Sequence, residues 1–92
     1  MPTEIVGSYA LYEEGRHTIT SDEASANTVS IPTRFNRVTN ALVQIVDSGN
    51  NDVTADADIT WSGSTLIVAD GSTYNTTAGY VIRYLVFGVG GL

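Results

Sequence analysis

The chain has 92 residues, with ten acidic side chains, four arginines, no lysine and no cysteine, and its formal net charge is −6 at pH 7. A core this small cannot be divided and stay folded, so we expect a single domain over residues 1–92 that gains no stability from disulfides. The negative charge and the lack of a basic cluster argue against nucleic-acid binding, because a phosphate backbone needs a positive surface.

The apolar segments are too short to span a membrane, which takes roughly 18 consecutive apolar residues. The longest of them, residues 80–87, is interrupted by Arg83. Residues 1–14 lack the basic start of a cleavable signal peptide. We therefore expect no membrane partner and no export by a cleavable signal.

The first third of the chain alternates between strand and turn signals. Residues 5–12 are predicted as a strand, followed by a turn at residues 13–15 and a hairpin partner at residues 16–20. The polar residues 21–27 form either a loop or a single helical turn that begins at Ser21. A short strand over residues 28–31 ends at Pro32, because proline cannot donate a hydrogen bond to a neighbouring strand.

The middle of the chain predicts a long strand and a hairpin. Residues 37–46 carry apolar side chains on both faces near the end of the strand. Residues 47–51 indicate a turn, after which residues 53–58 resume an extended course. Residues 59–61 and 65–69 flank a three-residue loop at positions 62–64, which predicts a β-hairpin.

The predicted last strand, residues 79–87, is apolar on both faces. Its two faces are Tyr80, Ile82, Tyr84 and Val86 on one side and Val81, Arg83, Leu85 and Phe87 on the other. In a sheet with one solvent-facing side, apolar residues alternate with polar ones. This strand is therefore either central in a two-layer sandwich or covered by another subunit. The glycine-rich residues 88–92 are expected to form a flexible tail.

The expected fold is all-β. Six to eight short strands with turns at intervals of about ten residues favour an antiparallel β-sandwich or a jelly-roll-like barrel. No internal repeat or linker divides the chain. A sandwich of this size cannot hide both faces of the last strand by itself, so we expect a homo-oligomer.

The sequence has no arrangement typical of catalysis, and we expect neither an enzyme nor a cofactor. His17 is the only histidine and no Gly-x-Ser-x-Gly motif accompanies it, so an exposed or edge-strand histidine is the simpler interpretation. Asp58 and Asp70 flank the predicted hairpin, but two carboxylates without a cleft do not make a glycosidase.

Two further groups of residues are candidate binding sites. Aspartates occur at positions 47, 52, 56 and 58, but their spacing does not follow the calcium loop Asp-x-Asp-x-Asp-Gly. A solvated acidic loop is therefore favoured over a metal site. Tyr74 and Tyr80 either stack on a sugar or pack in the core, and packing is favoured because aromatic rings usually supply buried area.

Arg83 is the most informative single residue, because it stands on an otherwise apolar strand face. Such an arginine normally pairs with a carboxylate or with carbonyl groups. The partner is either an aspartate of the same chain or a carboxylate of another subunit. We therefore predict that the last strand contributes an interface with another chain, through Tyr80, Ile82, Arg83, Tyr84, Val86 and Phe87.

The strand and turn rhythm of residues 38–88 resembles that of small β-sandwich structural proteins of tailed viruses, bacteriophage or archaeal. The resemblance rests on Ala-Leu-Val-Gln-Ile at 41–45, Ile-Thr-Trp-Ser-Gly-Ser-Thr-Leu-Ile-Val-Ala-Asp-Gly at 59–71 and Gly-Tyr-Val-Ile-Arg-Tyr-Leu-Val-Phe-Gly at 79–88. Within that group, the short acidic members are similar to head decoration (cement) proteins, which sit on the capsid as oligomers and brace it.

The resemblance implies a virion structural protein on the capsid exterior that binds the major capsid protein. It also implies a homo-oligomer, and we expect a trimer. It carries no catalytic residues over to this chain. The last strand then supplies the oligomer or capsid interface. The alternative is a tail or fibre component that binds a carbohydrate or receptor, with an aromatic platform beside residues 70–75.

Overall fold

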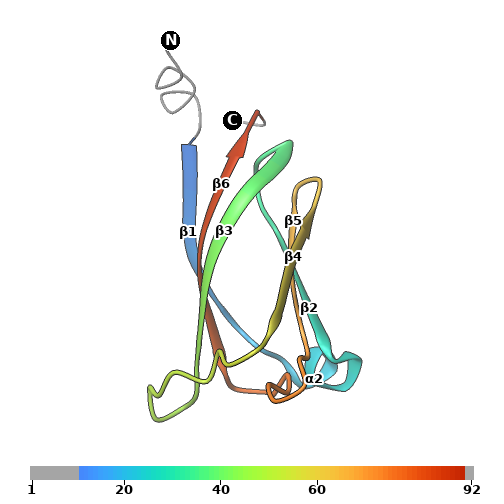
Figure 1. Ribbon diagram of the computed structural model, residues 1–92, viewed down its shortest axis with the longest axis vertical. Coiled ribbons are helices and arrows are strands. Elements are labelled where there is room, and N and C mark those ends of the chain that lie inside the picture. Colours follow the sequence, from blue (N-terminus) through green and yellow to red (C-terminus); the bar gives the residue numbers. More distant parts are fainter. Residues whose placement is uncertain (1–10, 91–92) are drawn as a thin grey trace.

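The computed structural model describes residues 11–90, which form two three-stranded sheets and one short helix (Figure 1). Sheet A contains β1 (Leu11–Thr18), β6 (Val81–Val89) and β3 (Arg37–Val46), in that order across the sheet. Sheet B contains β2 (Thr28–Pro32), β5 (Thr65–Ala69) and β4 (Asp58–Ser62). All paired strands are antiparallel. The predicted antiparallel β-sandwich is thus confirmed, and within residues 11–90 the sheets do not close into a barrel.

The core lies between the two sheets, where alternate residues of facing strands are buried. The central strands contribute most: Ile82 and Val86 of β6 and Leu66 and Val68 of β5 are fully buried. The other buried apolar side chains of this cluster are Ile19, Val29, Ile31, Phe35, Val38, Ile45 and Tyr74. Burying one large apolar side chain contributes roughly 1.5–3 kcal/mol, so this cluster is the main source of stability.

Strand β1 differs from the prediction. Of the predicted first strand, residues 5–10 lie outside the described residues. The predicted turn at residues 13–15 and the separate partner strand at 16–20 are wrong, because β1 runs uninterrupted through both. Gly15 permits this, since the Tyr84 ring of the neighbouring strand occupies the place where a side chain at position 15 would stand.

Helix α2 (Ser21–Ala26) confirms the helical turn predicted among residues 21–27. Its N-cap is Thr20 rather than Ser21. The Thr20 hydroxyl accepts a hydrogen bond from the Glu23 N–H at 3.2 Å, and the Glu23 carboxylate accepts one from the Thr20 N–H at 2.9 Å. Among residues 11–90, no helix has the length and apolar character needed to cross a membrane.

Strand β3 and the β4–β5 hairpin lie where the sequence predicted them. The turn after β3 is organised by Asp47, whose carboxylate accepts a hydrogen bond from the Gly49 N–H at 2.9 Å. The extended course predicted for residues 53–58 is wrong at residues 55–56, where a turn is closed by a hydrogen bond from the Ala57 N–H to the Thr54 carbonyl at 3.0 Å. The hairpin loop has two residues rather than three.

The flexible tail predicted at residues 88–92 is wrong for its first two residues. Gly88 and Val89 belong to β6 and pair with neighbouring strands. Gly88 is buried, and a side chain there would collide with the Phe35 ring. This glycine is therefore needed for close packing of the strand. Residues 91–92 lie outside the described residues.

Removing a core side chain from β6 tests this architecture. Ile82→Ala should lower the free energy of unfolding by about 2–5 kcal/mol, because it deletes buried methyl groups and leaves a cavity. Thr60→Ala, at an exposed position of β4, should change it by no more than about 1 kcal/mol. Urea unfolding followed by circular dichroism measures both variants. Equal losses for the two would contradict the core assignment.

Candidate functional site

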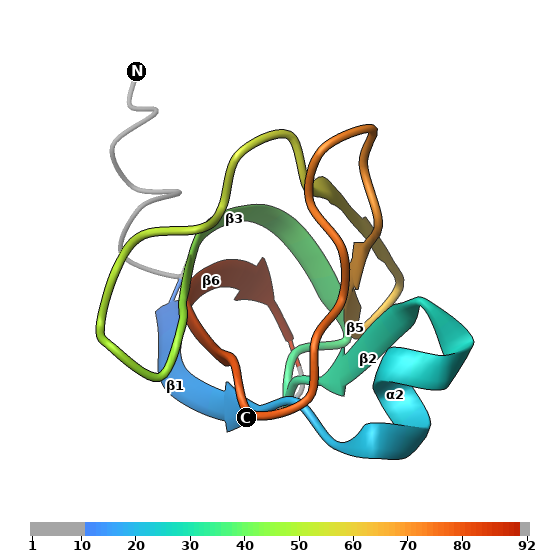
Figure 2. The same ribbon diagram turned by 90° about the horizontal axis from the view of Figure 1, so that it is seen from below.

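Among residues 11–90, no second layer covers one side of sheet A. The inner side packs on the core, and α2 lies beside β2 (Figure 2). We name the other side the outer face of sheet A; the side chains that stand on it include Tyr12, Glu14 and Arg16 of β1, Arg83, Leu85 and Phe87 of β6, and Leu42 and Gln44 of β3. Tyr12 is 62% exposed and Leu42 is 60% exposed. The outer face thus presents apolar side chains to solvent.

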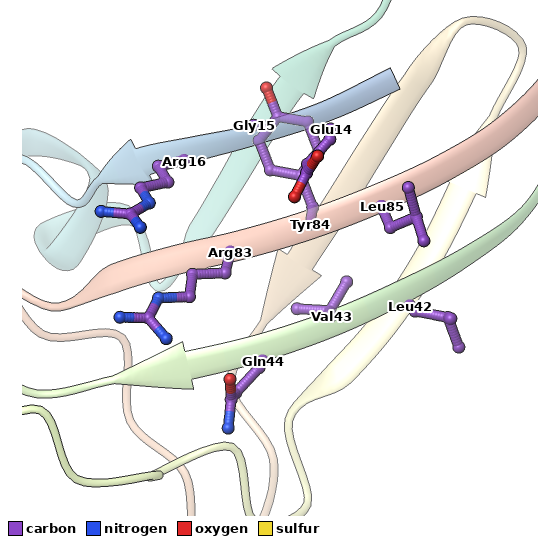
Figure 3. A pocket seen from close by; sticks show the side chains of 9 residues that line it. All are labelled: Glu14, Gly15, Arg16, Leu42, Val43, Gln44, Arg83, Tyr84 and Leu85. Carbon is purple, nitrogen blue, oxygen red and sulfur yellow. The ribbon is translucent and has the colours of Figure 1, made fainter. Parts of the chain in front are cut away.

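An open trough crosses the outer face between two rows of side chains (Figure 3). Within each row the members are cross-strand neighbours: Glu14, Leu85 and Leu42 form one row, and Arg16, Arg83 and Gln44 form the other. Between the rows, residues 15, 84 and 43 contribute backbone, because alternate residues of a strand point to opposite faces. The trough has a volume of about 550 Å³. One of its walls carries two leucines and the other two arginines.

The two arginines of the trough face each other across neighbouring strands. Arg16 is the cross-strand partner of Arg83, and like charges placed directly opposite are destabilising. The Arg83 Nη2 donates a hydrogen bond to the Asn50 Oδ1 at 3.0 Å, while its Nε is buried without a partner among the described residues. The predicted ion pair between Arg83 and an aspartate of the same chain is not formed within residues 11–90. Pairing with a carboxylate of another subunit stays a prediction.

The six residues predicted to form an interface are divided between two sides of the sheet. Ile82 and Val86 are fully buried in the core, so the prediction that they contact another chain is wrong. Tyr80 and Tyr84 are partly exposed and also pack against the core. Arg83 and Phe87 stand on the outer face. Contact of another chain with Tyr80, Tyr84, Arg83 or Phe87 stays a prediction, and only the last two of these stand on the outer face.

Three apolar residues of the outer face were not singled out from the sequence: Tyr12, Leu42 and Leu85. The signal for Leu85 was present, because a strand has a period of two and this residue shares a face with Arg83 and Phe87. Leu42 and Tyr12 join the same surface only through the pairing of β3 and β1 with β6. That pairing does not follow from one sequence.

His17 joins strand β1 to helix α2. Its Nε2 lies 2.8 Å from the Oε1 of Glu23. Partial burial raises the pKa of Glu23, but the hydrogen bonds from the Thr20 N–H and from His17 outweigh this effect and place the pKa below its usual value. The histidine lies on an edge strand, as the simpler interpretation predicted, and holds the helix against the sheet.

Aspartates of the acidic loops accept hydrogen bonds within the chain. Asp56 accepts hydrogen bonds from the Ser72 hydroxyl at 2.6 Å and from the Tyr74 N–H at 2.8 Å. These hydrogen bonds, that of Ser72 first, hold the pKa of Asp56 well below its usual range. Asp70 likewise accepts from the Thr76 hydroxyl at 2.6 Å. Within residues 11–90, no three acidic, histidine or cysteine side chains gather as a metal site would require.

Tyr74 belongs to the core. Only 3% of this residue is exposed, so the interpretation as a packing residue is confirmed for it. Burial raises the pKa of its phenol, and the hydroxyl has no hydrogen-bond partner among the described residues. Tyr80 is partly exposed and lines a hollow of about 320 Å³ with Tyr74. The buried Tyr74 ring is not available to stack on a sugar at the surface.

The carboxylate of Asp56 predicts a pH-dependent stability. Asp56→Asn should lower the melting temperature at pH 7, because an amide replaces a charged acceptor that holds the loop at residues 72–74. The stabilisation from a lowered pKa is present above the pKa of an unfolded aspartate, about 3.9, and is lost as the pH falls through the native value. The difference between variant and wild type should therefore be constant down to about pH 5 and shrink below about pH 4.

Thermal unfolding at several pH values measures this difference. Asp58→Asn is the matched control, since Asp58 is exposed and its side chain makes no hydrogen bond among the described residues. A difference for Asp56→Asn that persists unchanged to the lowest pH, or one equalled by the control, would contradict the assigned role.

Comparison with protein families, curated proteins and solved structures finds no significant match for this chain. The fold is described by its own strand pairing. The outer face of sheet A carries two of the exposed large apolar side chains, Tyr12 and Leu42, next to the charged Glu14 and Arg16.

Proposed function

We propose that this protein is a virion structural protein, a capsid decoration protein that binds the lattice of the major capsid protein and forms a homo-oligomer. The observation that carries the proposal is the outer face of sheet A, which leaves Tyr12 and Leu42 in solvent beside the partly buried Leu85 and Phe87. Contiguous apolar side chains rimmed by polar ones are typical of protein interaction sites.

The energetics of this face favour contact with another protein. Apolar area removed from water contributes roughly 25 cal/mol per Å², so covering several large side chains supplies a few kcal/mol of association free energy. The strands beneath the face are paired along their length, and the Tyr84 ring packs over Gly15. A rigid apolar surface loses little conformational entropy on association, which suits a protein that braces a lattice.

The placement in a virion is supported by the sequence. The strand and turn rhythm of residues 38–88 is similar to that of head decoration proteins, and the three segments that carry it include β3, the β4–β5 hairpin and β6. In this proposal the protein lies on the capsid exterior, and the outer face of sheet A meets either the shell or another copy of the chain.

The alternative, a tail or fibre component that binds a carbohydrate or receptor, has less support. It requires an aromatic platform beside residues 70–75, and Tyr74 is buried there. Trp61, 38% exposed on the edge strand β4, offers a single ring on the other sheet. Measurable glycan binding that is lost on Trp61→Ala would favour this alternative over decoration.

The capsid assignment is tested on particles. Virions of the virus that encodes this protein are purified on a density gradient. The protein should co-sediment with intact heads in a fixed ratio to the major capsid protein. Heads stripped of it should lose their contents at a lower temperature. Recovery of the protein only as a free monomer at the top of the gradient would contradict the assignment.

A charge placed on the outer face tests its role in self-association. Leu42→Asp should lower the average mass seen in sedimentation velocity at high protein concentration, because it buries an unpaired carboxylate in the contact. Thr60→Asp is the matched control, an exposed position in the middle of β4 on sheet B. If both variants sediment like the wild type, the outer face is not the self-association surface.

A further inference from the structure

The outer face of sheet A carries opposite charges that are not paired within residues 11–90. Glu14 and Arg16 are two residues apart on β1, so both side chains stand on this face, at opposite walls of the trough. Both are exposed. The ion pair found among the described residues, between His17 and Glu23, involves neither of them.

The arrangement of acidic and basic side chains on the outer face is complementary to that of a second copy. A two-fold axis that lies between two copies and runs across the strands places β1 of one copy over β1 of the other and reverses its direction. The acidic wall of one trough then meets the basic wall of the second copy. We propose that a second copy of this chain docks on the outer face in this way, so that Glu14 of each copy lies beside Arg16 of the other.

The apolar side chains fit the same arrangement. The row of Glu14, Leu85 and Leu42 in each copy lies against the row of Arg16, Arg83 and Gln44 of the other, beside a trough whose floor is backbone. The leucines then pack on the aliphatic stems of Arg83 and Gln44, as long polar side chains allow. Two sheets packed face to face in this manner lie about 10 Å apart.

The contact also relieves an unfavourable feature of the single chain. Arg16 and Arg83 are opposite each other, and among residues 11–90 neither has a carboxylate partner. A carboxylate of the second copy, entering the trough beside them, reduces the repulsion between the two guanidinium groups. In an isologous contact this gain occurs twice, once on each side of the axis.

The size of the face sets the expected affinity. The strands of sheet A have 8, 9 and 10 residues. With about 3.3 Å per residue and about 4.8 Å between strands, the face measures roughly 400 Å² in projection on each copy. Two such faces total roughly 800 Å², which is below the range of stable interfaces and typical of weak, transient ones, so we expect a dissociation constant on the order of 10–100 µM.

This inference rests on the proposed self-association and is tested separately from it by charge reversal. Glu14→Arg places two basic side chains against each other at both contacts, and Arg16→Glu places two acidic ones there. Each variant alone should dimerise at least about ten-fold more weakly than the wild type. An equimolar mixture of the two variants should dimerise again, because each contact then joins opposite charges.

Sedimentation equilibrium of the wild type, each variant and the mixture measures this, at low and high salt, with circular dichroism to establish that each variant is folded. The matched controls are Asp58→Arg and Arg34→Glu, which reverse exposed charges outside the outer face of sheet A. The controls, alone or mixed, should behave like the wild type.

Each other outcome overturns the inference in a recognisable way. If Leu42→Asp abolishes dimers while the charge variants and their mixture behave like the wild type, the face self-associates without this pairing. A wild type with three times the chain mass, as the resemblance to decoration proteins implies, excludes a two-fold contact but leaves the homo-oligomer in place. If the wild type is a monomer at all concentrations, both the two-fold contact and the homo-oligomer are contradicted.

Discussion

Strand β6 determines the structure because it is central in sheet A and has apolar side chains on both faces. Its inner side chains, Ile82 and Val86, fill the core between the sheets. Its outer side chains, Leu85 and Phe87, point to a side on which the described chain has no layer to cover them. The alternation that completes the core therefore also creates the open face from which the proposed assembly follows.

Several acidic side chains, in contrast, make hydrogen bonds that hold the loops and the helix in place. The carboxylates of Asp56 and Asp70 accept hydrogen bonds from the loop that leads to β6. Glu23 caps α2 and binds His17. These groups hold the connections of a small sandwich in place. Among residues 11–90, Arg16 and Arg83 on the outer face have no carboxylate partner, despite a net charge of −6.

Local patterns in the sequence predicted the long strand at 37–46, the hairpin around positions 62–64 and the two-sided last strand, because alternation and turn composition are properties of neighbouring residues. They failed at Gly15 and Gly88, which resemble turn and tail residues. Each of these glycines accommodates a distant aromatic ring, from Tyr84 and Phe35 respectively. The interface prediction failed at Ile82 for a related reason, since only strand pairing shows which side of β6 meets the core.

The fit of the Tyr84 ring over Gly15 also fixes the register of an edge strand. If β1 slipped by one residue against β6, Glu14 or Arg16 would come beneath the ring and a charged side chain would enter the core. Edge strands that can slide are prone to pair with other chains and to form fibrils. By opposing such a slip, a single aromatic side chain disfavours one route to disordered aggregation, and it does so from the inner side of the sheet, away from the face of the proposed contact.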